Sequence, residues 1–195
     1  MVQTPTKPVT LAEFLELPET KPASEYVDGA VIQKPMPQGK HSILQRDLCF
    51  ALTVAFKPTR LAQAIPELRC TFGDRSIVPD IVVFQESKIP RDANGEVSNT
   101  FDLAPDWTIF FQKRYANEIL SPGQSSTKVT QNILHCLAHG TVMGWLIDPE
   151  EQLILVYDEQ RSVQVFEASE TVLPVPEFAA GLALTLGEVF GWLTA

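Results

Sequence analysis

The segment Val78-Pro79-Asp80-Ile81-Val82-Val83-Phe84 constrains the fold more than any other part of the chain. Its unbroken apolar run is typical of a strand that is buried on both faces, which places it in the middle of a sheet. Pro79 has no N–H to donate, so it belongs near the beginning of that strand or at a bulge. A carboxylate is costly in such a run, so Asp80 is either a metal ligand or an acid that is hydrogen-bonded to a loop at the strand edge.

Three further side chains are candidates for the same site. Glu118 begins a second short apolar run that ends in Ser121-Pro122, and Glu25 precedes the apolar pair Tyr26-Val27. Two carboxylates on neighbouring strands are what a divalent cation such as Mg²⁺ needs. Lys128, near the start of a predicted helix, has the charge to stabilise a phosphate. The simpler alternatives are a surface acid for Glu118, a capping residue for Glu25 and a solvated lysine for Lys128.

The order of the predicted elements indicates an α/β fold around a mixed sheet. Helical spacing and capping residues predict helices at 11–17, 41–56, about 126–140 and 186–193. Strands are expected at 24–34 (a hairpin that turns at Asp28-Gly29), 62–72, 76–84, 107–111, 118–120, 144–149, 152–157 and 162–166. We expect a flexible arm at 1–9, one domain over 10–195 and a long surface loop at 85–103.

The charge balance is unusual for a protein that binds nucleic acid. The chain carries a net charge of −9, whereas such proteins usually show a basic surplus. A local basic groove is still compatible with the sequence, and its candidates are Lys34, Lys40, Arg46, Lys57 and Arg60. The 45% of hydrophobic residues argues against disorder. Neither an apolar run long enough for a membrane nor an N-terminal signal sequence is present, so we expect a cytoplasmic protein.

Cysteine and histidine do not form a recognisable metal or redox motif. Cys49, Cys70 and Cys136 are odd in number and none belongs to a Cys-x-x-Cys pair, so they are expected to be reduced and mostly buried. His135 and His139 lack the third ligand of a zinc motif. We interpret them and His41 as packing or surface residues. Glycine-rich phosphate loops and nucleophile-elbow motifs are absent.

Taken in order, several short segments resemble the bacterial restriction endonuclease-like family (Uma2-like) of the PD-(D/E)XK nuclease superfamily. The resemblance covers nearly the whole chain. The segments are Leu11-Ala12-Glu13-Phe14-Leu15, Glu25-Tyr26-Val27-Asp28-Gly29, Val78-Pro79-Asp80-Ile81-Val82, Ala104-Pro105-Asp106-Trp107, Glu118-Ile119-Leu120-Ser121-Pro122 and Gly144-Trp145-Leu146-Ile147-Asp148-Pro149.

The resemblance implies a restriction-endonuclease-like core, with a mixed central sheet flanked by helices, that hydrolyses DNA phosphodiester bonds with Mg²⁺ or Mn²⁺. Glu25 then matches the early acid, and Asp80 and Glu118 match the two metal-binding acids. The superfamily's lysine usually lies two residues after the second acid, where this chain has Leu120, so Lys128 is our choice. Many such nucleases cut as dimers, and the hairpin at 152–166 is a candidate pairing edge.

One departure from the family pattern concerns the second acid. The family pattern runs directly from Trp107-Thr108-Ile109 into Glu-Ile-Leu-Ser-Pro, but here residues 110–117 are interposed. If they loop out after Phe111, Glu118 returns to the site; if the strand continues, Phe110 faces the site instead. The second case predicts a catalytically impaired nuclease fold that serves as a binding or assembly module. A third hypothesis is a hydrolase of another phosphate ester.

Overall fold

The computed structural model describes residues 9–112 and 126–194, and the structural statements below concern these ranges. Six strands form a mixed sheet in the order β10-β9-β8-β7-β6-β3, and four form a second sheet in the order β2-β1-β5-β4. The strands are β1 (Ser24–Val27), β2 (Ala30–Gln33), β3 (Ala62–Pro66), β4 (Cys70–Phe72), β5 (Arg75–Ile77), β6 (Ile81–Gln85), β7 (Trp107–Phe111), β8 (Met143–Asp148), β9 (Leu153–Asp158) and β10 (Val163–Phe166). The helices are α1 (Leu11–Leu15), α2 (Gly39–Phe56), α3 (Ser126–Ala138) and α4 (Leu186–Gly191), with short 3-10 turns η1 (Glu86–Lys88) and η2 (Glu177–Ala179).

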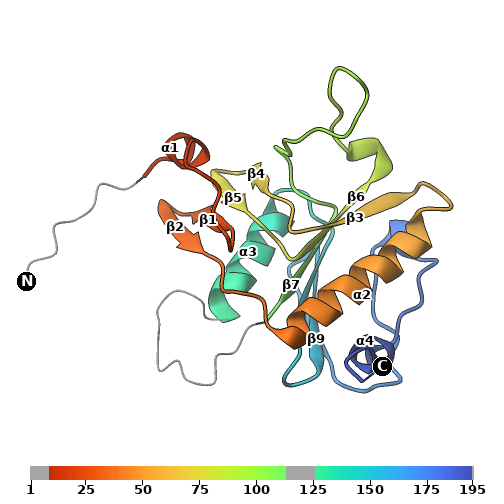
Figure 1. Cartoon of the computed structure of the whole chain (residues 1–195). Coiled ribbons are helices and arrows are strands. Elements are labelled where there is room, and N and C mark those ends of the chain that lie inside the picture. Colours follow the sequence, from red (N-terminus) through yellow and green to blue (C-terminus); the bar gives the residue numbers. More distant parts are fainter. Residues whose placement is uncertain (1–8, 113–125, 195) are drawn as a thin grey trace, which may run out of the picture.

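The six-stranded sheet is covered on both faces, as Figure 1 shows, with α2 on one side and α3 on the other. Side chains alternate along β7, so its residues belong to two different cores. Ile109 and Phe111 pack in the core that contains Leu44 of α2, whereas Phe110 packs in the core that contains Ile133 of α3. The mixed α/β architecture predicted from the sequence is confirmed.

The strands expected at 62–72 and 76–84 are each divided between the two sheets, so the expectation of two continuous strands is wrong. Glu67 follows Pro66 with a positive φ of 51°, which ends β3 and lets β4 begin in the other sheet. Pro79, which has no backbone donor, lies between β5 and β6 in the same way. Asp80 therefore stands just before β6, where the chain passes from the small sheet to the large one.

Most other elements agree with the sequence. The Thr10–Glu13 capping box is present at α1, although the helix ends at Leu15 rather than at residue 17. The β1–β2 turn has positive φ angles at Asp28 and Gly29, as a two-residue hairpin requires. The 85–103 loop contains η1. The predicted strand 107–111 is confirmed at both ends.

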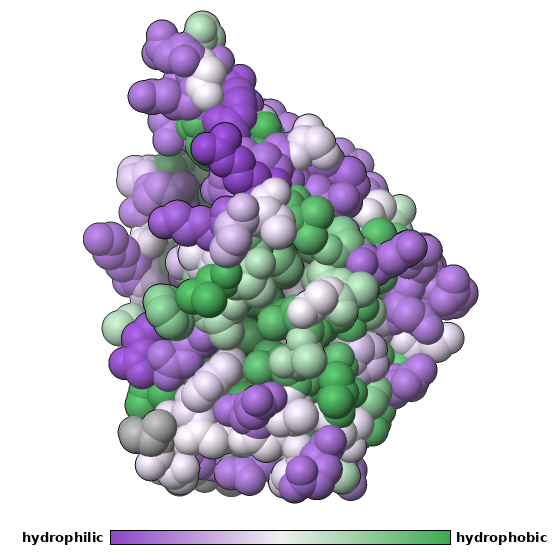
Figure 2. Space-filling view, turned by 90° about the vertical axis from the view of Figure 1, so that its right-hand side faces the viewer, coloured by the Kyte–Doolittle hydropathy of each residue, from purple (hydrophilic) through white to green (hydrophobic). Residues whose placement is uncertain are grey.

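One surface region bears on association. The β9–β10 hairpin is confirmed, and β10 lies at the edge of the large sheet with Val163 and Val165 about half exposed. Self-association through this edge stays a prediction. Hydrophobic side chains also gather in the middle of the face shown in Figure 2, on the side where α4 and the end of α2 lie.

Within the described ranges, no helix is both long enough and apolar enough to cross a membrane.

The three cysteines are free, and we expect them to differ in reactivity. Cys70 and Cys136 are fully buried, and burial raises the pKa of the Cys70 thiol to about 12 and that of Cys136 well above its ordinary value. Cys49 is only partly buried. Since the thiolate is the nucleophile, iodoacetamide at pH 8 should alkylate Cys49 first in the native chain, and all three thiols in urea. Mass spectrometry measures this, and equal native rates at Cys49 and Cys136 would contradict the buried placement.

Candidate functional site

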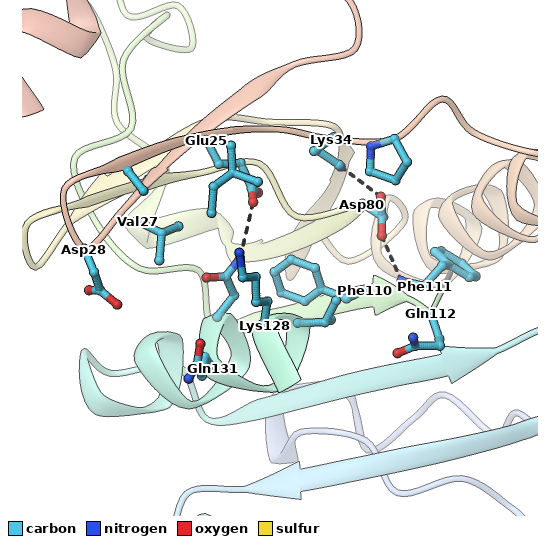
Figure 3. A pocket seen from close by; sticks show the side chains of 15 residues that line it. Glu25, Val27, Asp28, Lys34, Asp80, Phe110, Phe111, Gln112, Lys128 and Gln131 are labelled. Carbon is cyan, nitrogen blue, oxygen red and sulfur yellow. Dashed lines mark hydrogen bonds and ion pairs between the residues drawn. The ribbon is translucent and has the colours of Figure 1, made fainter. Parts of the chain in front are cut away.

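A cavity of about 280 Å³ lies between the β1–β2 hairpin, the end of β7 and the first turns of α3. Figure 3 shows its lining side chains, which come from segments far apart in the sequence. Much of the lining is apolar, and Phe110 and Phe111 are its apolar residues from β7. The polar lining residues that concern the site are Glu25, Lys34, Asp80, Lys128 and Asn132.

Asp80 is held firmly from two sides. Its Oδ2 accepts a hydrogen bond of 2.8 Å from the backbone N–H of Phe111, and its Oδ1 accepts one of 2.9 Å from Nζ of Lys34. The side chain is 3% exposed, so both interactions are made in a largely water-free setting. The backbone carbonyl of Asp80 accepts from Gln45 of α2. Asp80 is therefore an oriented, ion-paired carboxylate.

Lys34, which follows β2, is the direct partner of that carboxylate. Its Nζ also donates to the carbonyl of Val78 at 2.8 Å and to Oε1 of Glu67 at 3.3 Å. Burial opposes the charged form, but the carboxylates of Asp80 and Glu67 outweigh it, so the pKa of Lys34 is raised. The sequence suggested Lys34 only as a candidate for a basic groove.

Glu25 of β1 shares the cavity and is also buried. Its Oε1 accepts a 2.7 Å hydrogen bond from the Val78 N–H, and its Oε2 accepts one of 3.3 Å from Asn132 of α3. Burial raises the pKa of Glu25, which the bond from Val78 and the charge of Lys34 offset only in part. Since Val78 precedes Pro79 and Asp80, the same short segment connects both acids.

The sequence indicates a packing or surface role for His41, but in the structure its side chain lies beside the carboxylate of Asp80. Its Nε2 is 3.5 Å from Oδ1 of Asp80, and both side chains are 3% exposed. One ligand atom each from His41, Glu67 and Asp80 lie within 4.8 Å of one another, a spacing that suits a metal ion. A signal was available, because His41 continues the buried stripe of α2 formed by Leu44, Leu48 and Leu52. His135 stacks on the ring of Phe72, and His139 packs against the same ring at a tilt.

Phe110 occupies the cavity wall next to the acids. β7 pairs with β8 through the partners Phe110–Leu146 and Phe111–Ile147, and the N–H of Gln112 still donates to Ile147 at 2.7 Å. The strand thus extends to Phe111, and Phe110 faces the cavity with 5% of its surface exposed. Whether the chain then loops out and returns Glu118 to the site stays a prediction. Glu118 lies outside the described residues.

The remaining basic candidates do not share one groove. Lys128 lines the cavity from the first turn of α3. Lys40 pairs with Glu150, and Arg46 pairs with its neighbour Asp47. Lys57 and Arg60 line a different cavity near the end of α2, together with Arg91.

Comparisons with known proteins bear on the family and the fold. A model of the family Uma2, described as "Putative restriction endonuclease", matches residues 11–187. Among solved structures, the chain is similar to a crystal structure from Anabaena variabilis ATCC 29413, described as "a putative nuclease belonging to DUF820". The two sequences are 56% identical, the match covers 95% of this chain and 99% of the other, and the TM-score is 0.88. None of the curated proteins compared with the chain matches it.

Proposed function

Since this chain belongs to the Uma2 restriction endonuclease-like family, we propose that its cavity is a divalent-metal site that hydrolyses DNA phosphodiester bonds. The observation that carries the proposal is the setting of Asp80. This buried carboxylate already accepts from a cation, the Lys34 ammonium, beside the second buried acid Glu25. A position where oxygen atoms stabilise an ammonium has the charge and the donor atoms that Mg²⁺ or Mn²⁺ prefers. The donor set therefore fits a divalent ion.

Each residue has a distinct part in the proposal. Asp80 and Glu118 would hold the ion, and a bound ion would supply an activated water and neutralise charge on the phosphate. Glu25 fixes the backbone before Asp80 through its hydrogen bond with Val78, so it orients that carboxylate. Lys128, on the cavity wall, would contact a phosphate oxygen.

DNA as the substrate follows from the family rather than from charge. The net charge of −9 and the scattered lysines and arginines favour weak binding with few phosphate contacts, and therefore a shallow dependence on salt. Comparing the cleavage of plasmid DNA, RNA and a small phosphodiester at low salt tests the choice. If only the small phosphodiester is hydrolysed, the substrate is another phosphate ester rather than DNA.

A second candidate function is a non-catalytic binding or assembly module with the nuclease fold. The position of Phe110 favours it, because an apolar ring fills the cavity wall at the place expected for the second acid. This module would show no cleavage and no metal affinity, while keeping a specific partner.

Replacing Asp80 with Asn tests the metal site. We expect the affinity for Mn²⁺ to fall at least about tenfold, and metal-dependent cleavage of supercoiled plasmid to be lost, because a neutral amide is a poor ligand for a hard cation. Calorimetry measures the first effect and gel mobility the second. Asp92→Asn, in the exposed 85–103 loop, is the matched control. Equal Mn²⁺ binding by wild type and Asp80→Asn would refute the metal site.

A further inference from the structure

The Lys34 ammonium has three N–H groups, and three oxygen atoms lie within hydrogen-bonding distance of its Nζ. They belong to the Val78 carbonyl at 2.8 Å, the Asp80 carboxylate at 2.9 Å and the Glu67 carboxylate at 3.3 Å. With its donors engaged in this way, Lys34 is poorly suited to orient a water or a phosphate. It behaves instead as a cation that is bound in an oxygen-lined site and attached to the chain by its own side chain.

We propose that Lys34 is an internal competitor of the divalent ion, which binds Asp80 only after the lysine ammonium has moved off Oδ1. The proposal rests on the nuclease-like metal site proposed above and concerns its regulation. Two cations on one carboxylate oxygen repel each other strongly where the groups are shielded from water. The Lys34 side chain is 11% exposed and that of Asp80 is 3% exposed, so solvent screens this repulsion little.

The surroundings of Lys34 include a cavity that can receive its displaced side chain. This neighbouring cavity, also of about 280 Å³, has Lys34, Gln45 and Glu67 in its lining, together with Lys21. The Glu67 side chain is 45% exposed and borders that cavity. An ammonium that leaves Asp80 can therefore keep Glu67 as its partner, and the exchange does not leave a buried lysine without a counter-charge.

The same geometry separates this role from simple support of the fold. A supporting lysine would make metal binding weaker when it is removed, because Asp80 would lose its orientation. A competing lysine makes metal binding tighter when it is removed, because Asp80 keeps its second hydrogen bond from Phe111. The direction of the change in Mn²⁺ affinity thus decides between the two roles.

Calorimetric titration of the full chain with Mn²⁺ provides the test. We expect Lys34→Met to bind Mn²⁺ about tenfold tighter than wild type, since one competing charge is gone. Lys34→Gln, which keeps a donor to Asp80, should also bind more tightly. Lys34→Arg, which keeps the charge, should stay near wild type. Lys40→Met removes an exposed lysine that pairs with Glu150 and serves as the matched control.

The outcomes distinguish the proposals. Tighter binding in the two neutral variants, lost again when Asp80→Asn is added, supports the competitor role. Equal or weaker binding in folded Lys34→Gln overturns it, while Asp80-dependent binding by the wild type would leave the proposed function standing. Absence of Mn²⁺ binding in wild type and in every Lys34 variant would refute both.

Discussion

Deleting residues 110–117 is expected to produce a chain that binds Mn²⁺ at least about tenfold tighter than the native one and cleaves plasmid DNA about 100-fold faster. The deletion joins Ile109 directly to Glu118. Glu118 then takes the strand position of Phe110, opposite Leu146, and Ile119 takes that of Phe111. Because Phe110 lines the cavity with Glu25 and Asp80, Glu118 would be fixed on β7 itself and face both acids, which would strengthen the metal binding proposed for it in the native chain.

The fold should tolerate this change. Among the removed residues that the structure describes, Phe110 packs in the core beneath α3 and Phe111 in the core beneath α2, where Ile119 would keep an apolar residue. The same deletion with Glu118→Gln is the matched control, since it keeps the length but removes the charge. A deletion variant that is folded by circular dichroism and binds Mn²⁺ no better than the native chain would show that position 110 does not face the metal.

Asp106→Ala is expected to lower the free energy of unfolding by about 3 kcal/mol, from the usual cost of losing hydrogen bonds to a buried charge. Asp106 is fully buried, and its carboxylate accepts from the backbone N–H and the side chain of Gln85 and from Lys88. These bonds fix the end of β6 and η1 to the beginning of β7. Its removal leaves the Gln85 N–H in a partly buried place without its acceptor.

Urea denaturation followed by tryptophan fluorescence measures this loss. Asp102→Ala is the matched control, because Asp102 is an exposed acid in the same connection between η1 and β7 and should change the unfolding free energy by less than about 0.5 kcal/mol. A loss below about 1 kcal/mol for Asp106→Ala would mean that water replaces the carboxylate at little cost.

Local patterns predicted much of the fold. β7 and the β9–β10 hairpin were found because a short apolar run and a turn are properties of adjacent residues. α2 followed from apolar spacing within eighteen residues. The small sheet was missed because it depends on where two apolar runs break, at Pro66-Glu67 and at Pro79, and an apolar run does not reveal which sheet its halves join.

The site was predictable only in part for a related reason. Asp80 could be singled out because a carboxylate conflicts with its own apolar neighbours. Lys34 could not, because its meaning comes from a residue 46 positions later in the chain. His41 lies between the two cases, since its place on the apolar stripe of α2 is visible in the sequence but its contact with Asp80 is not.

The passage of the chain through Val78 and Pro79 has a mechanical consequence. Glu25 belongs to the small sheet and accepts a hydrogen bond from the Val78 N–H. Asp80, two residues after Val78, accepts one from the Phe111 N–H of the large sheet. The two acids are thus hydrogen-bonded to different sheets, and the two positions involved, Val78 and Asp80, flank the rigid Pro79. A displacement of the small sheet relative to the large one therefore changes the distance between the two acids. A ligand that moves the β1–β2 hairpin would change the surroundings of Asp80.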